Sequence, residues 1–233
     1  MRLEIQSDQT VLRTLFTITG VLAAGDIVLS LLHSLAGLTI PRPVFMLLDL
    51  GVEGGVPTLY SSAQLALAAA LLGVVAARKP EQRWGWILLA IGFAFLSLDE
   101  LAAIHEEWGA VARGSVEKKG FFYFRWIAVA LVLLPAVLLL FLPLLRSLEA
   151  GVRRDFIIAG TIFVGSAVGL EGVGGMVASA GMSDSLGYNL LNVLENGGEL
   201  IGIALFVGAL LRLLAVTPAP SARAQAPREM AGA

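Results

Sequence analysis

The sequence predicts an all-α integral membrane protein, a polytopic bundle of six transmembrane helices. Two observations predict this class. Of the 233 residues, 57% are hydrophobic and only 15% are charged, whereas soluble domains carry about 25% charged residues. In addition, six apolar segments are each long enough to cross the hydrocarbon core of a bilayer, which takes about 20 helical residues.

The spans can be placed in order along the chain. We predict them at residues 12–35, 58–77, 84–104, 123–145, 155–179 and 189–214. Aromatic and basic residues at several of these ends, such as Trp84, Trp126 and Arg146, are typical of a membrane interface. The fifth span is the least regular, because the glycine-rich stretch that begins at Glu171 favours an early break in the helix.

The basic residues predict the orientation. With the N-terminus inside, 11 of the 16 Lys and Arg residues lie on the inner side, as the positive-inside rule requires. Both termini are therefore predicted to be cytoplasmic, in a multi-pass protein of the plasma (inner) membrane. Residues 1–216 form the transmembrane helical domain, and residues 217–233 are small, polar and proline-containing, which predicts a disordered cytoplasmic tail.

Seven carboxylates lie in or at the ends of these apolar segments. An acidic side chain at the centre of a membrane helix costs roughly 2.5 to 3.5 kcal/mol on insertion scales, so such residues normally face a protein interior and mark a site. The predicted topology brings all seven to the outer half of the bilayer, which predicts a site on the outer, periplasmic side. The seven are Glu53, Asp99, Glu100, Glu106, Glu171, Glu195 and Glu199.

Helical spacing groups some of these acids. Residues spaced by three and four lie on one helix face, and in the last span this spacing joins Tyr188, Asn192, Glu195 and Glu199. Gly198 and Gly202 on the same helix predict close approach of a neighbouring helix. In the third span, His105 is roughly 120° from Asp99 in an ideal helix. Both side chains can reach one centre only if the helix ends or distorts near Ala103.

Seven carboxylates beside one histidine cannot all stay ionised in a low-dielectric pocket, so either some are protonated or cations neutralise them. Oxygen ligands with one imidazole suit a divalent metal such as Zn, Fe, Mn, Mg or Ca. We expect Asp99, Glu100 and Glu199 to be catalytic. The expected metal ligands are Asp99, Glu100, His105, Glu106, Glu171, Glu195 and Glu199, and the expected supporting groups are Glu53, Tyr60, Ser61, Ser62 and Asn192.

Other features narrow the chemistry. The chain has no cysteine and a formal net charge of −2, which argues against thiolate chemistry and against nucleic acid as a partner. The Glu-x-x-His pairs of di-iron bundles are not found. Asp26 and His33 share a face of the first span and form either a further site or an internal hydrogen-bonding pair.

The run from Glu53 through Ser61 to Asp99 and Glu100 is similar to the alkaline ceramidase and progestin-receptor superfamily. In that family an acid, a serine and an LDE-like stretch accompany a zinc site held by histidines. This chain has only His33 and His105, so it departs from the family's ligand set. The chain also resembles multipass bacterial membrane proteins that carry a similar SLDE…HE stretch, a likeness that implies no activity.

Three functions are compatible with this pattern. The favoured one is a metal-dependent membrane enzyme, hydrolytic or redox, that acts on a lipid or other apolar substrate. The alternatives are a proton or cation transporter or channel that uses the same acids, and an accessory subunit of a membrane complex. The expected partners are membrane lipid and either a second copy of the chain or another membrane protein.

Overall fold

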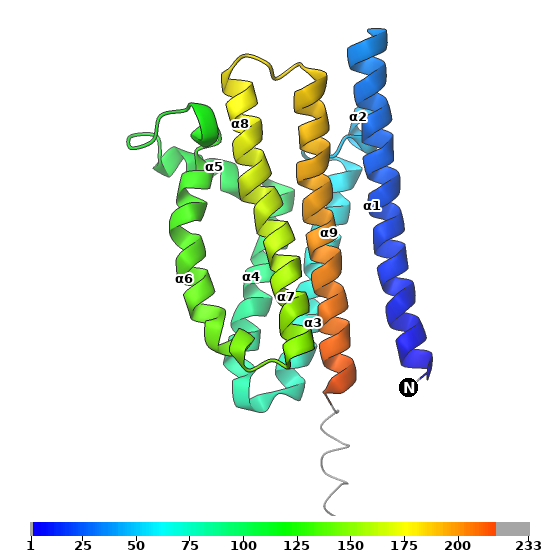
Figure 1. Cartoon of the computed structure of the whole chain (residues 1–233), viewed down its shortest axis with the longest axis vertical. Helices are drawn as coiled ribbons and strands as arrows, with labels where there is room; N and C mark the ends of the chain where they lie inside the picture. Colours follow the sequence, from blue (N-terminus) through cyan, green and yellow to red (C-terminus); the bar gives the residue numbers. More distant parts are fainter. Residues whose placement is uncertain (1, 218–233) are drawn as a thin grey trace, which may run out of the picture.

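The computed structural model describes residues 2–217, with side chains from residue 9 onward, and over this range the chain is helical without strands (Figure 1). The helices are α1 (Arg2–Ala36), α2 (Arg42–Leu48), α3 (Val56–Arg78), α4 (Arg83–Ala102), α5 (Ile104–Val111), α6 (Trp126–Arg146), α7 (Ala150–Val164), α8 (Glu171–Ser179) and α9 (Leu186–Val216). The all-α prediction is confirmed for these residues. The predicted tail lies outside the described residues apart from Thr217.

Six helical segments among the described residues are long and apolar enough to cross a membrane. They are Gln9–Ala36, Val56–Arg78, Pro80–Ala102, Trp126–Arg146, Ala150–Ser179 and Leu186–Val216. Each overlaps one predicted span, so the predicted number of helices that are long and apolar enough to span a membrane is confirmed. The orientation of the termini relative to a membrane stays a prediction.

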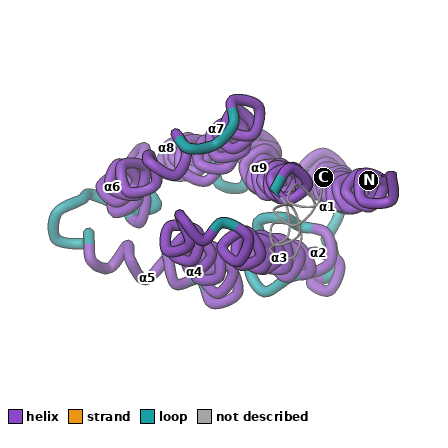
Figure 2. Tube along the Cα trace, turned by 90° about the horizontal axis from the view of Figure 1, so that it is seen from below, coloured by secondary structure: helices purple, strands orange, loops and turns teal. Residues whose placement is uncertain are grey.

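The helices form two layers (Figure 2). One layer holds α3 and α4, which pack against each other, with the short α2 and α5 beside them; the other holds α6, α7, α8 and α9. Helix α9 also contacts α1 and α3, so it joins the layers. The start of α1 and the end of α9 lie at the same end of the bundle (Figure 1). We call this the terminal end, and the opposite end the distal end.

The apolar core lies in the half of the bundle near the terminal end. Its fully buried side chains include Leu72 of α3, Trp86 of α4 and Leu210 of α9. In a bilayer, close van der Waals packing of such side chains, rather than their removal from water, holds the helices together. The distal half holds the polar side chains described below.

The fifth span does not break where its glycines favoured a break. Helix α7 runs through a π-helical turn, Gly165–Leu170, directly into α8, so the helix continues to Ser179. The π turn faces α9, where a side-chain carbon added at Gly198 would overlap the Ser166 hydroxyl. The expectation of an early break was therefore wrong, and a local widening of the helix takes its place.

Candidate functional site

A left-handed residue between α4 and α5 builds the first element of the site. Ala103 has φ +48° and ψ +40°, so the chain turns there and α5 starts in a new direction. The turn brings His105 back over the last part of α4. The His105 backbone N–H donates to Asp99 Oδ1 at 2.6 Å, and His105 Nδ1 lies 3.0 Å from Asp99 Oδ2. The distortion that the helical angles required near Ala103 is therefore present.

The turn at Ala103 gives a testable prediction. A residue with a β-carbon in the left-handed region costs roughly 1 to 2 kcal/mol, and glycine does not bear this cost. We expect Ala103→Gly to raise the thermal unfolding midpoint of the detergent-solubilised protein and Ala103→Val to lower it. An Ala103→Gly variant that is clearly less stable than the parent would contradict the left-handed conformation.

Trp126, at the start of α6, joins the histidine to α8. Its ring packs edge-on against the His105 ring, with centroids 5.3 Å apart, and its Nε1 donates to Glu171 Oε1 at 2.9 Å. Glu171 is the first residue of α8, directly after the π turn. Four elements, α4, α5, α6 and α8, thus contribute to one connected group of side chains.

The charges around His105 affect its protonation. Burial alone lowers the pKa of His105, but the hydrogen bond and charge of Asp99, together with the charges of Glu171 and Glu53, more than offset burial. The net pKa of His105 lies above its ordinary value of about 6.5. Burial and the charge of Glu106 raise the pKa of Glu53, which lies in the α2–α3 loop.

The predicted stripe on α9 faces the same region. Glu199 interacts electrostatically with Glu100 of α4, with Glu171 of α8 and with Glu195, its neighbour one turn earlier. All four side chains remain partly exposed. In the described part of the chain the ion pairs of Lys and Arg involve Asp155 rather than these carboxylates. Among the described residues, the acids of α4, α8 and α9 therefore face one another without a Lys or Arg partner, and His105 is the basic group near Glu100 and Glu171.

The close approach predicted at the α9 glycines is present. A β-carbon added at Gly202 would lie 2.7 Å from the backbone nitrogen of Phe163 in α7. Gly174 of α8 lies beside Glu195, with 3.8 Å between an added β-carbon and Glu195 Oε2. Small residues thus let α7 and α8 pack directly on the acidic face of α9.

The expected supporting groups have different surroundings. Ser61 lies beside Glu100. Ser62 is buried and exchanges hydrogen bonds with Ser97, which tie α3 to α4. Tyr60 donates to the Leu15 carbonyl oxygen of α1 at 2.7 Å. Asn192 lines a separate pocket at the distal end. Of the hydroxyl groups expected to support the site, that of Ser61 therefore lies next to a predicted catalytic acid, Glu100.

A group of packed aromatic rings lies on the terminal side of the acids. Phe93 of α4 stacks on Phe206 of α9 with ring centroids 4.6 Å apart, and Phe206 packs against Phe156, which in turn packs against Trp86. Phe93 and Phe206 are each seven residues, about two helical turns, from Glu100 and Glu199 respectively. The polar side chains of the site thus lie between these rings and the distal end.

The predicted metal ligands do not converge closely enough for a metal ion as they stand. Within the described residues, no three histidine or acidic side chains form a group that could hold one. Metal sites in proteins usually take three or more ligands at about 2.0 to 2.6 Å. The divalent metal therefore stays a prediction, and the residues present do not fit it in this arrangement.

Taken together, the helices and the site define a protein whose six apolar helices are long enough to span a membrane, with a histidine–aspartate pair and partly exposed carboxyl groups between its two layers. The chain belongs to the family described as a domain of unknown function (DUF8692), whose model matches residues 14–213, from α1 into α9. No curated protein matches the chain. No solved structure matches it either.

Sequence reasoning missed one member of the site. Trp126 was interpreted as an interfacial aromatic, because tryptophan at a helix end is typical of the membrane boundary. In the structure its indole N–H is directed at Glu171. The predicted position of Trp126 at the same bilayer depth as an intramembrane acid could have indicated this hydrogen bond.

Proposed function

We propose that the protein is a membrane-embedded enzyme that carries out acid–base chemistry on a lipid or other apolar substrate. The observation that carries the proposal is the bond between His105 Nδ1 and Asp99 Oδ2. A carboxylate on one ring nitrogen fixes the tautomer and the orientation of an imidazole, and this leaves the other nitrogen, Nε2, to accept a proton from substrate or water.

Each acid has a role in this proposal. Asp99 positions His105, which acts as the general base. Glu100 and Glu199 face each other on α4 and α9, and a carboxyl group in apolar surroundings that keeps its proton can act as the general acid. Glu171, held by Trp126, adds negative charge next to His105 and stabilises the imidazolium that forms when His105 takes up a proton.

The apolar surroundings support the choice of substrate. In the most apolar stretch of each helix, only 11% of the residues of α4 and 6% of those of α6 are buried inside the protein, whereas 50% are buried in α9. Leu98, directly before Asp99, is 60% exposed. An acyl chain that lies against these faces in the bilayer brings its polar end to the level of Asp99 and Glu100. This geometry favours lateral entry of a lipid over entry of a water-soluble substrate.

The packed aromatic rings bear on the transport alternative. A transport site needs a route to both faces of the membrane. The stacked rings of Phe93 and Phe206 lie between α4 and α9 on the terminal side of the acids. The arrangement therefore supports a one-sided site more than a pathway.

The test uses the protein in nanodiscs that contain phosphatidylethanolamine, phosphatidylglycerol, cardiolipin and diacylglycerol, with mass spectrometry of the lipids over time. We expect the parent to convert at least one lipid class. His105→Gln should lose 99% or more of that rate, and the control Glu117→Gln, at an exposed acid outside the site, should keep it. A chelator added in parallel tests the predicted metal dependence.

Two results would contradict the proposal. One is conversion that survives in His105→Gln. The other is an inert parent protein whose liposomes instead show proton or cation flux that disappears in Glu199→Gln, which would establish the transporter.

A further inference from the structure

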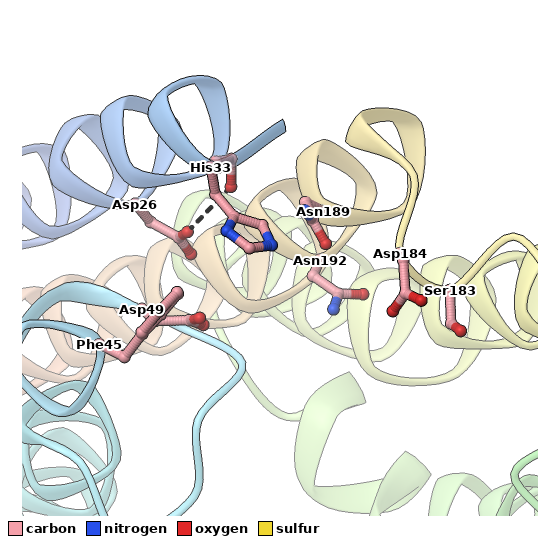
Figure 3. Close-up of a pocket in the computed structure, with 9 residues that line it drawn as sticks. Asp26, His33, Phe45, Asp49, Ser183, Asp184, Asn189 and Asn192 are labelled. Atoms are coloured by element: carbon pink, nitrogen blue, oxygen red, sulfur yellow. Dashed lines mark hydrogen bonds between the residues drawn. The ribbon is translucent and has the colours of Figure 1, made fainter. Parts of the chain in front are cut away.

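A polar pocket of about 180 Å³ lies at the distal end between α1, α2, α9 and the α8–α9 loop (Figure 3). Side chains from all four segments point toward one another there. Those that matter are Asp26, His33, Phe45, Asp49, Asp184 and Asn192. The described lining contains none of the seven carboxylates considered above.

The lining is rich in hydrogen-bond acceptors. Three carboxylates line the pocket, and its described lining includes no Lys or Arg. Asp26 is only 4% exposed; its Oδ2 accepts the Leu50 backbone N–H at 2.9 Å, and its Oδ1 accepts the Ser30 hydroxyl at 3.4 Å. An ionised carboxylate only accepts hydrogen bonds, and burying it without a cation is costly. The pocket therefore lacks a positively charged donor.

The loop after α2 contributes a second carboxylate that favours a positively charged donor in the pocket. Burial raises the pKa of Asp49, and the hydrogen bonds from the backbone of Gly51 and Val52 lower it only in part. A cation in the pocket would offset this desolvation by favouring the charged carboxylate. Asp26 lies in α1 and Asp49 in the loop after α2, and both are directed into the same space (Figure 3).

The histidine does not supply the missing charge to Asp26. His33 Nδ1 lies 3.2 Å from the Leu38 carbonyl oxygen, and the His33 ring packs edge-on against Phe45. Asp26 and His33 therefore do not form the direct hydrogen-bonding pair that the sequence allowed, although both line one pocket. Phe45 also lines the pocket, and the face of an aromatic ring attracts cations.

We propose that this pocket binds a small primary ammonium ion. An –NH₃⁺ group brings one positive charge and three donors, which suit a lining that supplies the carboxylates of Asp26, Asp49 and Asp184 and no described Lys or Arg. A cavity of about 150 Å³ takes a molecule of the size of benzene, so this volume suits an amine of a few heavy atoms. A free amine and the ethanolamine headgroup of a membrane lipid share this chemistry.

The test titrates ethanolamine into the full-length protein in nanodiscs made of phosphatidylcholine, with calorimetric detection, and repeats the titration with choline. Choline carries the same charge without N–H donors. We expect saturable ethanolamine binding and at least tenfold weaker choline binding. Asp184→Asn, at an exposed position, and Asp49→Asn should each weaken ethanolamine binding at least tenfold. The matched control Glu117→Gln removes an exposed acid elsewhere and should leave it unchanged.

The outcomes separate the possibilities. Absence of saturable binding, equal affinity for choline, or undiminished binding in both aspartate variants would overturn the proposal. A repeat in phosphatidylethanolamine nanodiscs then identifies the source. Weaker apparent ethanolamine affinity there assigns the pocket to the lipid headgroup by competition, and equal affinity assigns it to a free amine.

Discussion

Gly202→Ala is expected to lower the stability of the protein more than any other single-methyl change discussed here. The added carbon would lie 2.7 Å from the backbone nitrogen of Phe163 and 2.9 Å from its Cα. Backbone atoms cannot move aside as a flexible side chain can, so α7 and α9 must separate. Overpacking of this kind typically costs about 1 to 3 kcal/mol, measured as a lower free energy of unfolding in denaturant.

Gly197 provides the matched control on the same helix. It is buried, but an added β-carbon there has no atom within 4 Å outside the local helix. Alanine is favoured over glycine in a helix by about 1 kcal/mol, so Gly197→Ala should be neutral or stabilising. Equal effects of the two substitutions would show that α7 does not pack on α9 at Gly202.

Asp99→Asn is expected to have the largest effect on the chemistry of the site. Asp99 raises the pKa of His105 by its hydrogen bond and its charge; an amide removes that charge. The pKa of His105 should therefore fall relative to the parent. The chain has two histidines, so ring resonances in a ¹³C-detected NMR titration can be assigned by comparison with His33→Gln.

The same substitution changes the pH dependence of turnover. A general base must be unprotonated, so the rate of the parent should rise with pH through the pKa of His105. In Asp99→Asn this rise should move to lower pH. The maximal rate should fall by about 100-fold or more, because the imidazole loses its orienting partner. An unchanged titration of His105 would show that the two side chains do not interact in the membrane.

Hydropathy and helical spacing anticipated much of this structure. Six apolar runs of sufficient length predicted the six spans, because a membrane helix must satisfy its backbone hydrogen bonds internally. The angle between Asp99 and His105 correctly located the distortion near Ala103. The glycine spacing on α9 likewise predicted close packing, which Gly202 and Phe163 bear out.

Other features depend on contacts between distant segments. The Ser62–Ser97 pair ties two helices, and a serine in a single span does not reveal its partner. Asp49 lies in a loop outside every predicted span, so its place in the distal pocket left no signal in hydropathy. The predicted metal ligands share a region, but sequence spacing does not determine the distances among side chains of four different helices.

The π-helical turn before Glu171 determines where that carboxylate points. A turn that holds one extra residue rotates everything after it by about 100° relative to an uninterrupted α-helix. Without the extra residue, Glu171 and the glycine face of α8 would lie about 100° further round the helix, out of line with Trp126. The register of a single helical turn, Gly165–Leu170, therefore determines whether α8 presents an acid to the indole N–H beside the histidine.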